Sequence, residues 1–257
     1  MGLQHRVIAG SVKGALRMIF PPQCLGCAAS VTAAGDGTGS LCPGCWAETR
    51  FITGACCGRC GAPLPDDGHG QSTDEALTCD DCLAIARPWD SGRAALVYSG
   101  IGRQLVLMLK HGDRPDLAPT LAAWLARAAQ PVISPDMIVA PVPLHLRRLL
   151  KRKYNQATLI STRLARSHGL EHRDDLLIRR THTQMQDHRG VSDRFENLRG
   201  SMTVSAKRAQ GIQGRPILLV DDVMTSGATL SVATQALLAA GSGPVFVAVL
   251  ARAVKDD

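Results

Sequence analysis

Apolar and polar positions follow two different periods after residue 100, and these periods predict the secondary structure. Apolar residues recur every three to four positions in four segments, which predicts helices at residues 101–111, 117–129, 144–168 and 229–240. Uninterrupted apolar runs predict three buried strands, at residues 136–142, 216–220 and 244–250. Apolar strands that alternate with helices are typical of a parallel sheet covered on both faces. The sequence therefore predicts an α/β domain after residue 93.

The chain has a different pattern before residue 90. Apolar residues recur at helical spacing ahead of Pro21, which predicts an amphipathic helix within residues 1–22. Residues 23–88 are instead rich in glycine, proline and cysteine pairs, and residues 64–78 are polar and loop-like. Such a segment has too few apolar residues to fold without a metal. We therefore expect three units: the N-terminal helix, a metal-stapled module at residues 23–88, and the α/β domain at residues 93–257.

Composition is that of an ordinary globular protein. The 257 residues are 45% hydrophobic and 20% charged, which excludes a disordered or collagen-like chain. The longest stretch without a charged residue, 223–251, is interrupted by polar residues, glycine and proline, so we expect no membrane span. All nine cysteines precede residue 83, and a cysteine-free domain follows them. This segregation favours metal binding in a reducing compartment and predicts a cytoplasmic protein.

Eight of the cysteines form four CxxC pairs, which is a strong signal for zinc. The predicted ligands are Cys24, Cys27, Cys42, Cys45, Cys57, Cys60, Cys79 and Cys82. Pairing in sequence order would make two structural zinc ribbons, and an interleaved pairing is the alternative. A redox role would require a thioredoxin-like βαβ context, which this segment lacks. Cys56 is left over and is interpreted as a bystander thiol, although a shift of register could exchange it with Cys57.

The densest chemical signal is ILLVDDVMTSGATL at residues 217–230. A buried strand delivers Asp221 and Asp222 at its end, and a Thr/Ser/Gly turn then opens a helix whose free N–H groups face the same place. Carboxylates can accept hydrogen bonds from vicinal hydroxyls, and a turn of this kind can enclose a phosphate. The pattern thus predicts a sugar-phosphate site. A Walker A loop would need a lysine that is missing here, and a simple helix cap would use one carboxylate.

The run VDDVMTSGAT closely resembles the phosphoribosyl diphosphate (PRPP) motif of type I phosphoribosyltransferases. Over nearly its full length the chain is similar to the ComF family, in which a double zinc ribbon precedes a phosphoribosyltransferase-like domain. The other motifs that carry the resemblance are FPPQC at 20–24, Tyr98 with LKHG at 109–112, APVPLH at 140–145, NQA at 155–157, and Gln184, Arg194 and Asn197.

The resemblance implies roles for individual residues. Asp221 and Asp222 would be the catalytic pair that holds the ribose hydroxyls. The 5-phosphate would lie on Thr225, Ser226, Gly227, Ala228 and Thr229, and the diphosphate on the loop at Pro143 and Leu144. Residues 181–200 would form a hood over the ligand. Mg²⁺ would accompany PRPP and need few protein ligands.

Two functions follow from the resemblance. One is a phosphoribosyltransferase or PRPP-binding protein of nucleotide-related metabolism, in which diphosphate is displaced from the anomeric carbon. The other is a non-catalytic scaffold for DNA uptake in competence, which binds single-stranded DNA through the zinc ribbon and a basic helix and has a DNA-uptake helicase as a partner. The fold supports both functions.

A basic stretch bears on this choice. Residues 147–153 contain five cations, and Arg163 and Arg166 follow on the same predicted helix. The stretch is interpreted as a diphosphate clamp or as a nucleic-acid track, with a solvated helix face as the alternative. Two features weaken the case for nucleic acid. Eight thiolates and two zinc ions would lower the formal net charge of +7 by four, and the chain has few aromatic residues for base stacking.

The same stretch contains a departure from the family pattern. Arg152, Lys153 and Tyr154 stand where ComF proteins usually have Arg-Gly-Phe. Glycine there would permit an unusual backbone turn, so the sequence predicts a local difference at Lys153.

Overall fold

A computed structural model describes residues 21–31, 40–65, 77–111, 113–145, 149–150, 152–179 and 200–254. The predicted N-terminal helix and nearly all of the predicted hood lie outside these residues. So do Arg147, Arg148 and Lys151 of the basic stretch.

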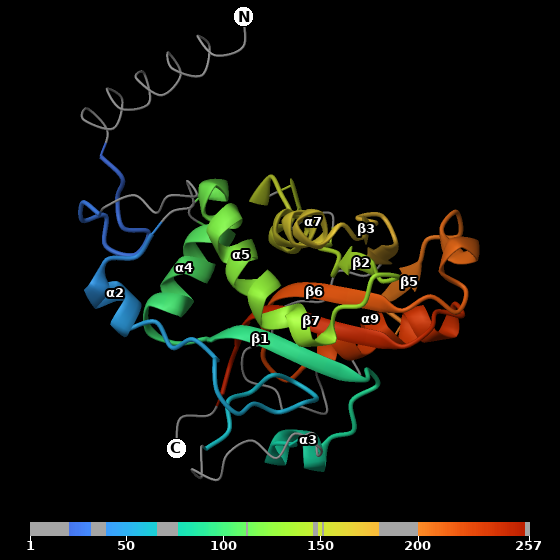
Figure 1. The fold of residues 1–257 in the computed structure, drawn as a ribbon. Coiled ribbons are helices and arrows are strands. Elements are labelled where there is room, and N and C mark those ends of the chain that lie inside the picture. Colours follow the sequence, from blue (N-terminus) through green and yellow to red (C-terminus); the bar gives the residue numbers. More distant parts are fainter. Residues whose placement is uncertain are drawn as a thin grey trace, which may run out of the picture.

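Five parallel strands form the central sheet in the order β1-β7-β6-β2-β3 (Figure 1). The strands are β1 (Ser91–Val97), β2 (Ile138–Pro141), β3 (Glu171–His172), β6 (Ile217–Met224) and β7 (Val245–Arg252). The three predicted strands correspond to β2, β6 and β7, which lie side by side in the middle of the sheet. The two edge strands, β1 and β3, were not predicted. The structure therefore confirms the parallel α/β prediction.

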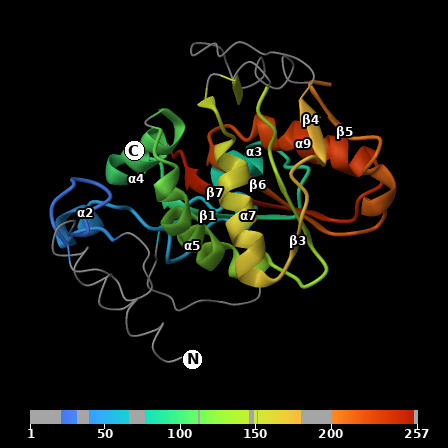
Figure 2. The ribbon, with the colours of Figure 1, turned by 90° about the horizontal axis from the view of Figure 1, so that it is seen from above.

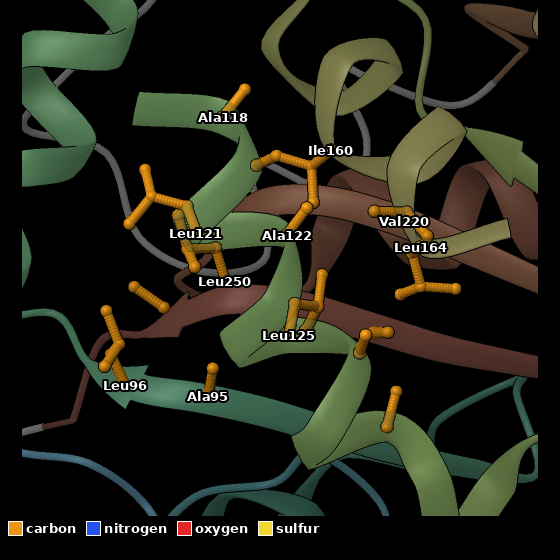
Figure 3. Close-up of a cluster of buried hydrophobic side chains, with 14 of the residues drawn as sticks. Ala95, Leu96, Ala118, Leu121, Ala122, Leu125, Ile160, Leu164, Val220 and Leu250 are labelled. Atoms are coloured by element: carbon orange, nitrogen blue, oxygen red, sulfur yellow. The ribbon is translucent and has the colours of Figure 1, made fainter. Parts of the chain in front are cut away.

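Helices cover both faces of the sheet (Figure 2). One face carries α4 (Gly100–His111), α5 (Ala118–Ala129) and α7 (Gln156–His168), and the other carries α9 (Ala228–Ala239). Side chains of α5 and α7 meet alternate residues of β6 and β7 in a buried cluster (Figure 3). The intervening strand residues, such as Leu219 and Val249, face α9. Burial on both faces explains why the central strands are continuous apolar runs.

The helix predicted at residues 144–168 is not continuous: residues 149, 150 and 152 are helical, but the helix is interrupted at residues 153–155. Within the described residues, helix α7 begins only at Gln156, because Asn155 has an extended backbone and caps it. The Asn155 side chain accepts a hydrogen bond from the Ala157 N–H at 3.0 Å. Lys153 has a positive φ of 67°, which no α-helix contains. Consequently Arg152 and Lys153 do not share a helix with Arg163.

Short elements complete the described residues. A separate antiparallel pair consists of β4 (Leu177–Arg179) and β5 (Met202–Val204). Three 3-10 turns are η1 (Pro115–Leu117), η2 (Gln130–Val132) and η3 (Ala209–Ile212). The cysteine-rich module contains α2 (Pro43–Ala47) and α3 (Asp80–Ala84). Among the described helices, none has the length and apolar character needed to cross a lipid bilayer.

The cysteine-rich module wraps around the β1 edge of the sheet. Cys24 and Cys45 are buried in the cluster on the α5 side, whereas Cys57, Cys60 and Cys82 are buried in the cluster on the α9 side. Residues 50–52, which lie between the two cysteine-rich halves of the module, pair with β1. The Ile52 N–H donates to the Ala95 carbonyl, and the Val97 N–H donates to the Arg50 carbonyl. This pairing covers an otherwise open sheet edge.

Candidate ligand site and zinc centres

Eight thiols form two groups of four, in sequence order. Cys24, Cys27, Cys42 and Cys45 make the first group, and Cys57, Cys60, Cys79 and Cys82 make the second. Within each group all sulfur atoms lie within 4.8 Å of one another. The structure thus decides between the two pairings left open by the sequence, in favour of two separate ribbons.

The sulfur geometry fits tetrahedral zinc. Zn–S bonds of about 2.3 Å place tetrahedral sulfur ligands about 3.8 Å apart. The Cys27 and Cys42 sulfurs are 3.7 Å apart in the first group, and the Cys60 and Cys79 sulfurs are 3.6 Å apart in the second. Hydrogen bonds from the Cys60 side chain and from backbone N–H groups lower the pKa of the Cys57 thiol to about 4, whereas the hydrogen bond with Cys57 and burial raise the pKa of the Cys60 thiol. This pair therefore favours one thiolate, on Cys57, before a metal binds.

Cys56 is not a member of either group within the described residues. It is half-buried and forms an isolated antiparallel bridge with Pro63, and burial raises the pKa of its thiol. Cys57, not Cys56, therefore occupies the ligand position.

The candidate sugar-phosphate site lies between the carboxyl ends of β2 and β6, whose following helices lie on opposite faces of the sheet. The chain leaves β2 toward α7 on one face and leaves β6 toward α9 on the other. Adjacent parallel strands whose following helices lie on opposite faces leave a crevice at their carboxyl ends, where open α/β sheets bind ligands. Pro141 pairs with Val220 at this edge, so the loops that follow the two strands begin side by side.

Asp221 and Asp222 lie in the carboxyl-terminal half of β6, directly after the predicted strand and two residues before β6 ends at Met224. The Asp222 N–H donates to Asp221 Oδ1 at 2.8 Å. Burial and the neighbouring Asp222 charge raise the pKa of Asp221 to about 7. Asp222 instead forms a largely buried ion pair with Lys110, whose Nζ is 2.9 Å from Asp222 Oδ1. Lys110 belongs to the LKHG motif, but the sequence alone did not assign it to the site.

The turn after β6 has the backbone of an anion-binding helix start. Gly227 caps α9 with φ of 80°, and the Ser226 hydroxyl accepts a hydrogen bond from the Ala228 N–H at 3.4 Å. A side chain at Gly227 would approach Arg87 and Trp89 to about 3 Å, so both space and φ require glycine. Thr225 is exposed and Thr229 is half-buried at this turn. The predicted residues 225–229 therefore form one continuous turn and helix start.

The loop after β2 is held by the first residues of α7. The Asn155 side-chain amide donates to the Val142 carbonyl at 3.0 Å, immediately before Pro143. Pro143 and Leu144 line a hollow of about 310 Å³ together with Tyr154 and Asn155. The Tyr154 hydroxyl donates to the Leu109 carbonyl at 2.8 Å and ties this region to α4. The NQA motif therefore positions the predicted diphosphate loop.

Lys153 adopts the left-handed backbone that glycine would adopt more readily, with φ of 67°. Its Nζ lies 2.5 Å from Asp113 Oδ2, and both side chains are exposed. The lysine therefore does not prevent a left-handed backbone at this position.

A second hollow of about 610 Å³ lies beside the edge strand β1. It brings together Trp46 and Phe51 of the cysteine-rich module with Trp124 of α5. The Trp46 and Phe51 rings are 4.5 Å apart, and the Phe51 and Trp124 rings are 5.0 Å apart. Arg93 and Arg127 line the same hollow, and none of its described lining residues is acidic. The sequence did not reveal this aromatic group because Trp124 is distant in the chain.

Comparisons with known proteins identify the family. Residues 15–83 match the family model of the double zinc ribbon domain. Competence protein F of Haemophilus influenzae is 29% identical over 240 residues, which cover 91% of this chain and 98% of that protein. DNA utilization protein YhgH of Salmonella typhi is 32% identical over 202 residues, which cover 76% of this chain and 83% of that protein. This chain belongs to the ComF family.

Among solved structures, this ComF family member overlaps an allosteric regulatory enzyme of purine biosynthesis and the glutamine PRPP amidotransferase of Bacillus subtilis. Identity is 18% and the TM-score 0.37 for both. The overlaps cover 56% and 55% of this chain and 30% of each of the other chains.

Proposed function

We propose that the α/β domain binds PRPP with Mg²⁺ at the carboxyl edge between β2 and β6. The observation that carries the proposal is the convergence of a carboxylate pair and a phosphate-type turn at the point where the sheet connections diverge. The names of the relatives, which refer to competence and DNA utilization, support a role of this activity in handling DNA or its nucleotides.

Each part of the site has a distinct task in the proposal. Asp221 and Asp222 accept hydrogen bonds from the ribose hydroxyls, and the N–H groups of residues 225–229 surround the 5-phosphate. The diphosphate lies on the loop at Pro143 and Leu144. Lys110 is within hydrogen-bond distance of Asp222 and orients that carboxylate.

Mg²⁺ would be held mostly by ligand oxygens and water, and the two carboxylates are the protein groups suited to it. The metal would neutralise diphosphate charge. Phosphoribosyl transfer would break the bond from the anomeric carbon to diphosphate while an acceptor forms a bond to that carbon, so turnover additionally requires an acceptor.

Calorimetric titration of the zinc-loaded protein with PRPP and Mg²⁺ tests the proposal. The double variant Asp221→Asn/Asp222→Asn should lose affinity at least about 100-fold, because two charge-assisted hydrogen bonds are removed. The matched control Asp116→Asn/Asp136→Asn changes two carboxylates elsewhere in the chain and should bind like wild type. Absence of binding by wild type, or equal binding by the Asp221/Asp222 variant, would overturn the proposal.

The aromatic hollow favours a second function, the binding of single-stranded DNA. Trp46 is 54% exposed, and the Phe51 ring packs between Trp46 and Trp124. Exposed aromatic faces stack on unpaired bases of any sequence, and nearby arginines attract the phosphate backbone. Arg93 and Arg127 provide that charge here. This surface differs from the basic stretch predicted by sequence, whose Arg147, Arg148 and Lys151 lie outside the described residues.

Fluorescence anisotropy with a labelled oligothymidine tests this second function. Trp46→Ala should weaken binding roughly 5- to 150-fold, which corresponds to about 1–3 kcal/mol for one stacked base. Arg127→Gln should weaken binding less and flatten its salt dependence. Leu83→Ala removes another exposed apolar side chain, on α3, and should have no effect. Unchanged affinity in both hollow variants would exclude this surface.

A further inference from the structure

The second zinc centre and the phosphate turn belong to one packed unit. Cys57, Cys60 and Cys82 are buried in the same cluster as Ala228 and Leu230 at the start of α9. The first zinc centre lies in the cluster on the opposite face of the sheet. A change at the second centre can therefore reach the turn through direct contacts.

Arg87 connects the two directly. Its Nε donates to Cys82 Sγ at 3.4 Å, and its Nη1 donates to the Ser226 carbonyl at 2.5 Å. Its guanidinium lies over the Trp89 ring, 5.6 Å from the centroid. The Trp89 Nε1–H in turn donates to the carbonyl of Arg59, a residue between Cys57 and Cys60, at 2.6 Å. The same guanidinium thus contacts a zinc ligand and the phosphate turn.

Arg252 makes a parallel connection from the end of β7. The residue is only 2% exposed, and its Nη1 donates to the Thr225 carbonyl at 2.8 Å. Its Nη2 lies 3.5 Å from Asp81, which stands between Cys79 and Cys82, and its charge also acts on the Cys60 thiol. Two arginines therefore hold successive carbonyls of the turn, those of Thr225 and Ser226, against the second ribbon.

Because peptide bonds are planar, these contacts to the carbonyls also orient the N–H groups of the same peptides. The described chain contains no cis peptide bond. In a planar trans peptide the C=O and the N–H point in opposite directions. Fixing the Thr225 and Ser226 carbonyls toward the ribbon therefore directs the N–H groups of Ser226 and Gly227 away from it. Those N–H groups are donors that the proposed 5-phosphate site would use.

Zinc occupancy should strengthen this arrangement. A zinc ion bound by four thiolates carries two net negative charges, which attract guanidinium groups and are offset by the two arginines. A metal-free ribbon lacks the ion that fixes the four sulfur atoms, so its acceptors are less rigid. The arginines would then hold the turn less firmly.

We propose that Arg87 and Arg252 are positioning residues through which the loaded second zinc centre fixes the phosphate turn and raises its affinity for PRPP. This inference rests on the proposed PRPP function. It makes the two sites thermodynamically linked, so that PRPP must raise the zinc affinity of the second centre by the factor by which zinc raises PRPP affinity.

The test measures PRPP affinity and zinc affinity on the full chain. Arg87→Ala should retain two zinc ions in zinc excess but bind PRPP at least about tenfold more weakly. Arg87→Lys keeps a positive charge but lacks the planar fork that reaches both acceptors, so it should also lose affinity. Arg215→Ala removes an arginine that pairs with Glu171 near the opposite end of β6 and should bind normally.

Zinc competition with a chelator at equilibrium supplies the readout that a merely structural role would not change. In wild type, PRPP should protect one of the two zinc ions, and Arg87→Ala should abolish that protection. If wild type binds PRPP but neither zinc ion is protected and Arg87→Ala binds normally, the inference is overturned and the PRPP function stands. If wild type binds no PRPP, both are overturned.

Discussion

Asp221 and Asp222 are adjacent in the chain but differ in their electrostatic surroundings. Asp222 has Lys110 as a partner, whereas burial and the Asp222 charge raise the pKa of Asp221 to about 7. Ionisation of Asp221 is therefore unfavourable in the ligand-free protein. Such a destabilised carboxylate is typical of a binding site, where the ligand supplies the missing interactions. The sequence predicted the pair and its position at a strand end. It could not predict the asymmetry, because Lys110 comes from a helix more than a hundred residues away.

This asymmetry predicts opposite effects of two similar substitutions on stability. The raised pKa of Asp221 favours the folded state while the carboxyl is protonated, and that contribution is lost as the pH rises from about 4 to about 7. Asp221→Asn should therefore raise the free energy of unfolding at pH 8, by at most about 4 kcal/mol, and change it little at pH 4. Asp222→Asn should lower it at pH 8 by about 1–3 kcal/mol because Lys110 loses its partner.

Urea unfolding at pH 4 and pH 8 measures both effects, with m-values as a check on two-state behaviour. Destabilisation of similar size by both substitutions at pH 8 would contradict the asymmetry.

Among the secondary-structure elements, helix α7 is preceded by a residue that both caps the helix and holds the proposed diphosphate loop. Asn155 serves both, because its side-chain oxygen accepts from the Ala157 N–H and its amide donates to the Val142 carbonyl. The sequence predicted continuous helix through this point because apolar spacing continues across residues 144–168. The cap and the left-handed Lys153 override that spacing. Short polar motifs can thus end a helix that periodicity alone would extend.

Two substitutions at Asn155 separate these roles. Asn155→Asp keeps an oxygen that can cap α7 but replaces the amide donor by an acceptor that repels the Val142 carbonyl. It should therefore change stability by less than about 1 kcal/mol while weakening PRPP binding several-fold. Asn155→Ala removes both interactions and should lower stability by about 1–2 kcal/mol as well as PRPP affinity.

Thermal unfolding and calorimetric titration of the two variants check this prediction. Equal PRPP affinity in Asn155→Asp and wild type would show that the loop does not depend on the amide.

At the scale of the whole molecule, the two zinc ribbons are integrated into the α/β domain. Each ribbon adds buried cysteines to the core on a different face of the sheet, and the segment between them covers the β1 edge. This arrangement was not predicted, since the change in pattern near residue 88 indicates separate units. The contacts of Arg87 and Arg252 depend on it.

The features that depend on local pattern could be predicted without any structure. Apolar runs predicted the three central strands because these strands are buried on both faces, and CxxC spacing predicted the zinc ligands because each knuckle is a local turn. The motif at residues 220–229 likewise predicted a strand, turn and helix start. The folded chain was needed to establish the cysteine grouping, the pairing of Lys110 with Asp222, the aromatic hollow and the two arginine connections. Each of these joins residues far apart in the chain, and no local periodicity encodes such contacts.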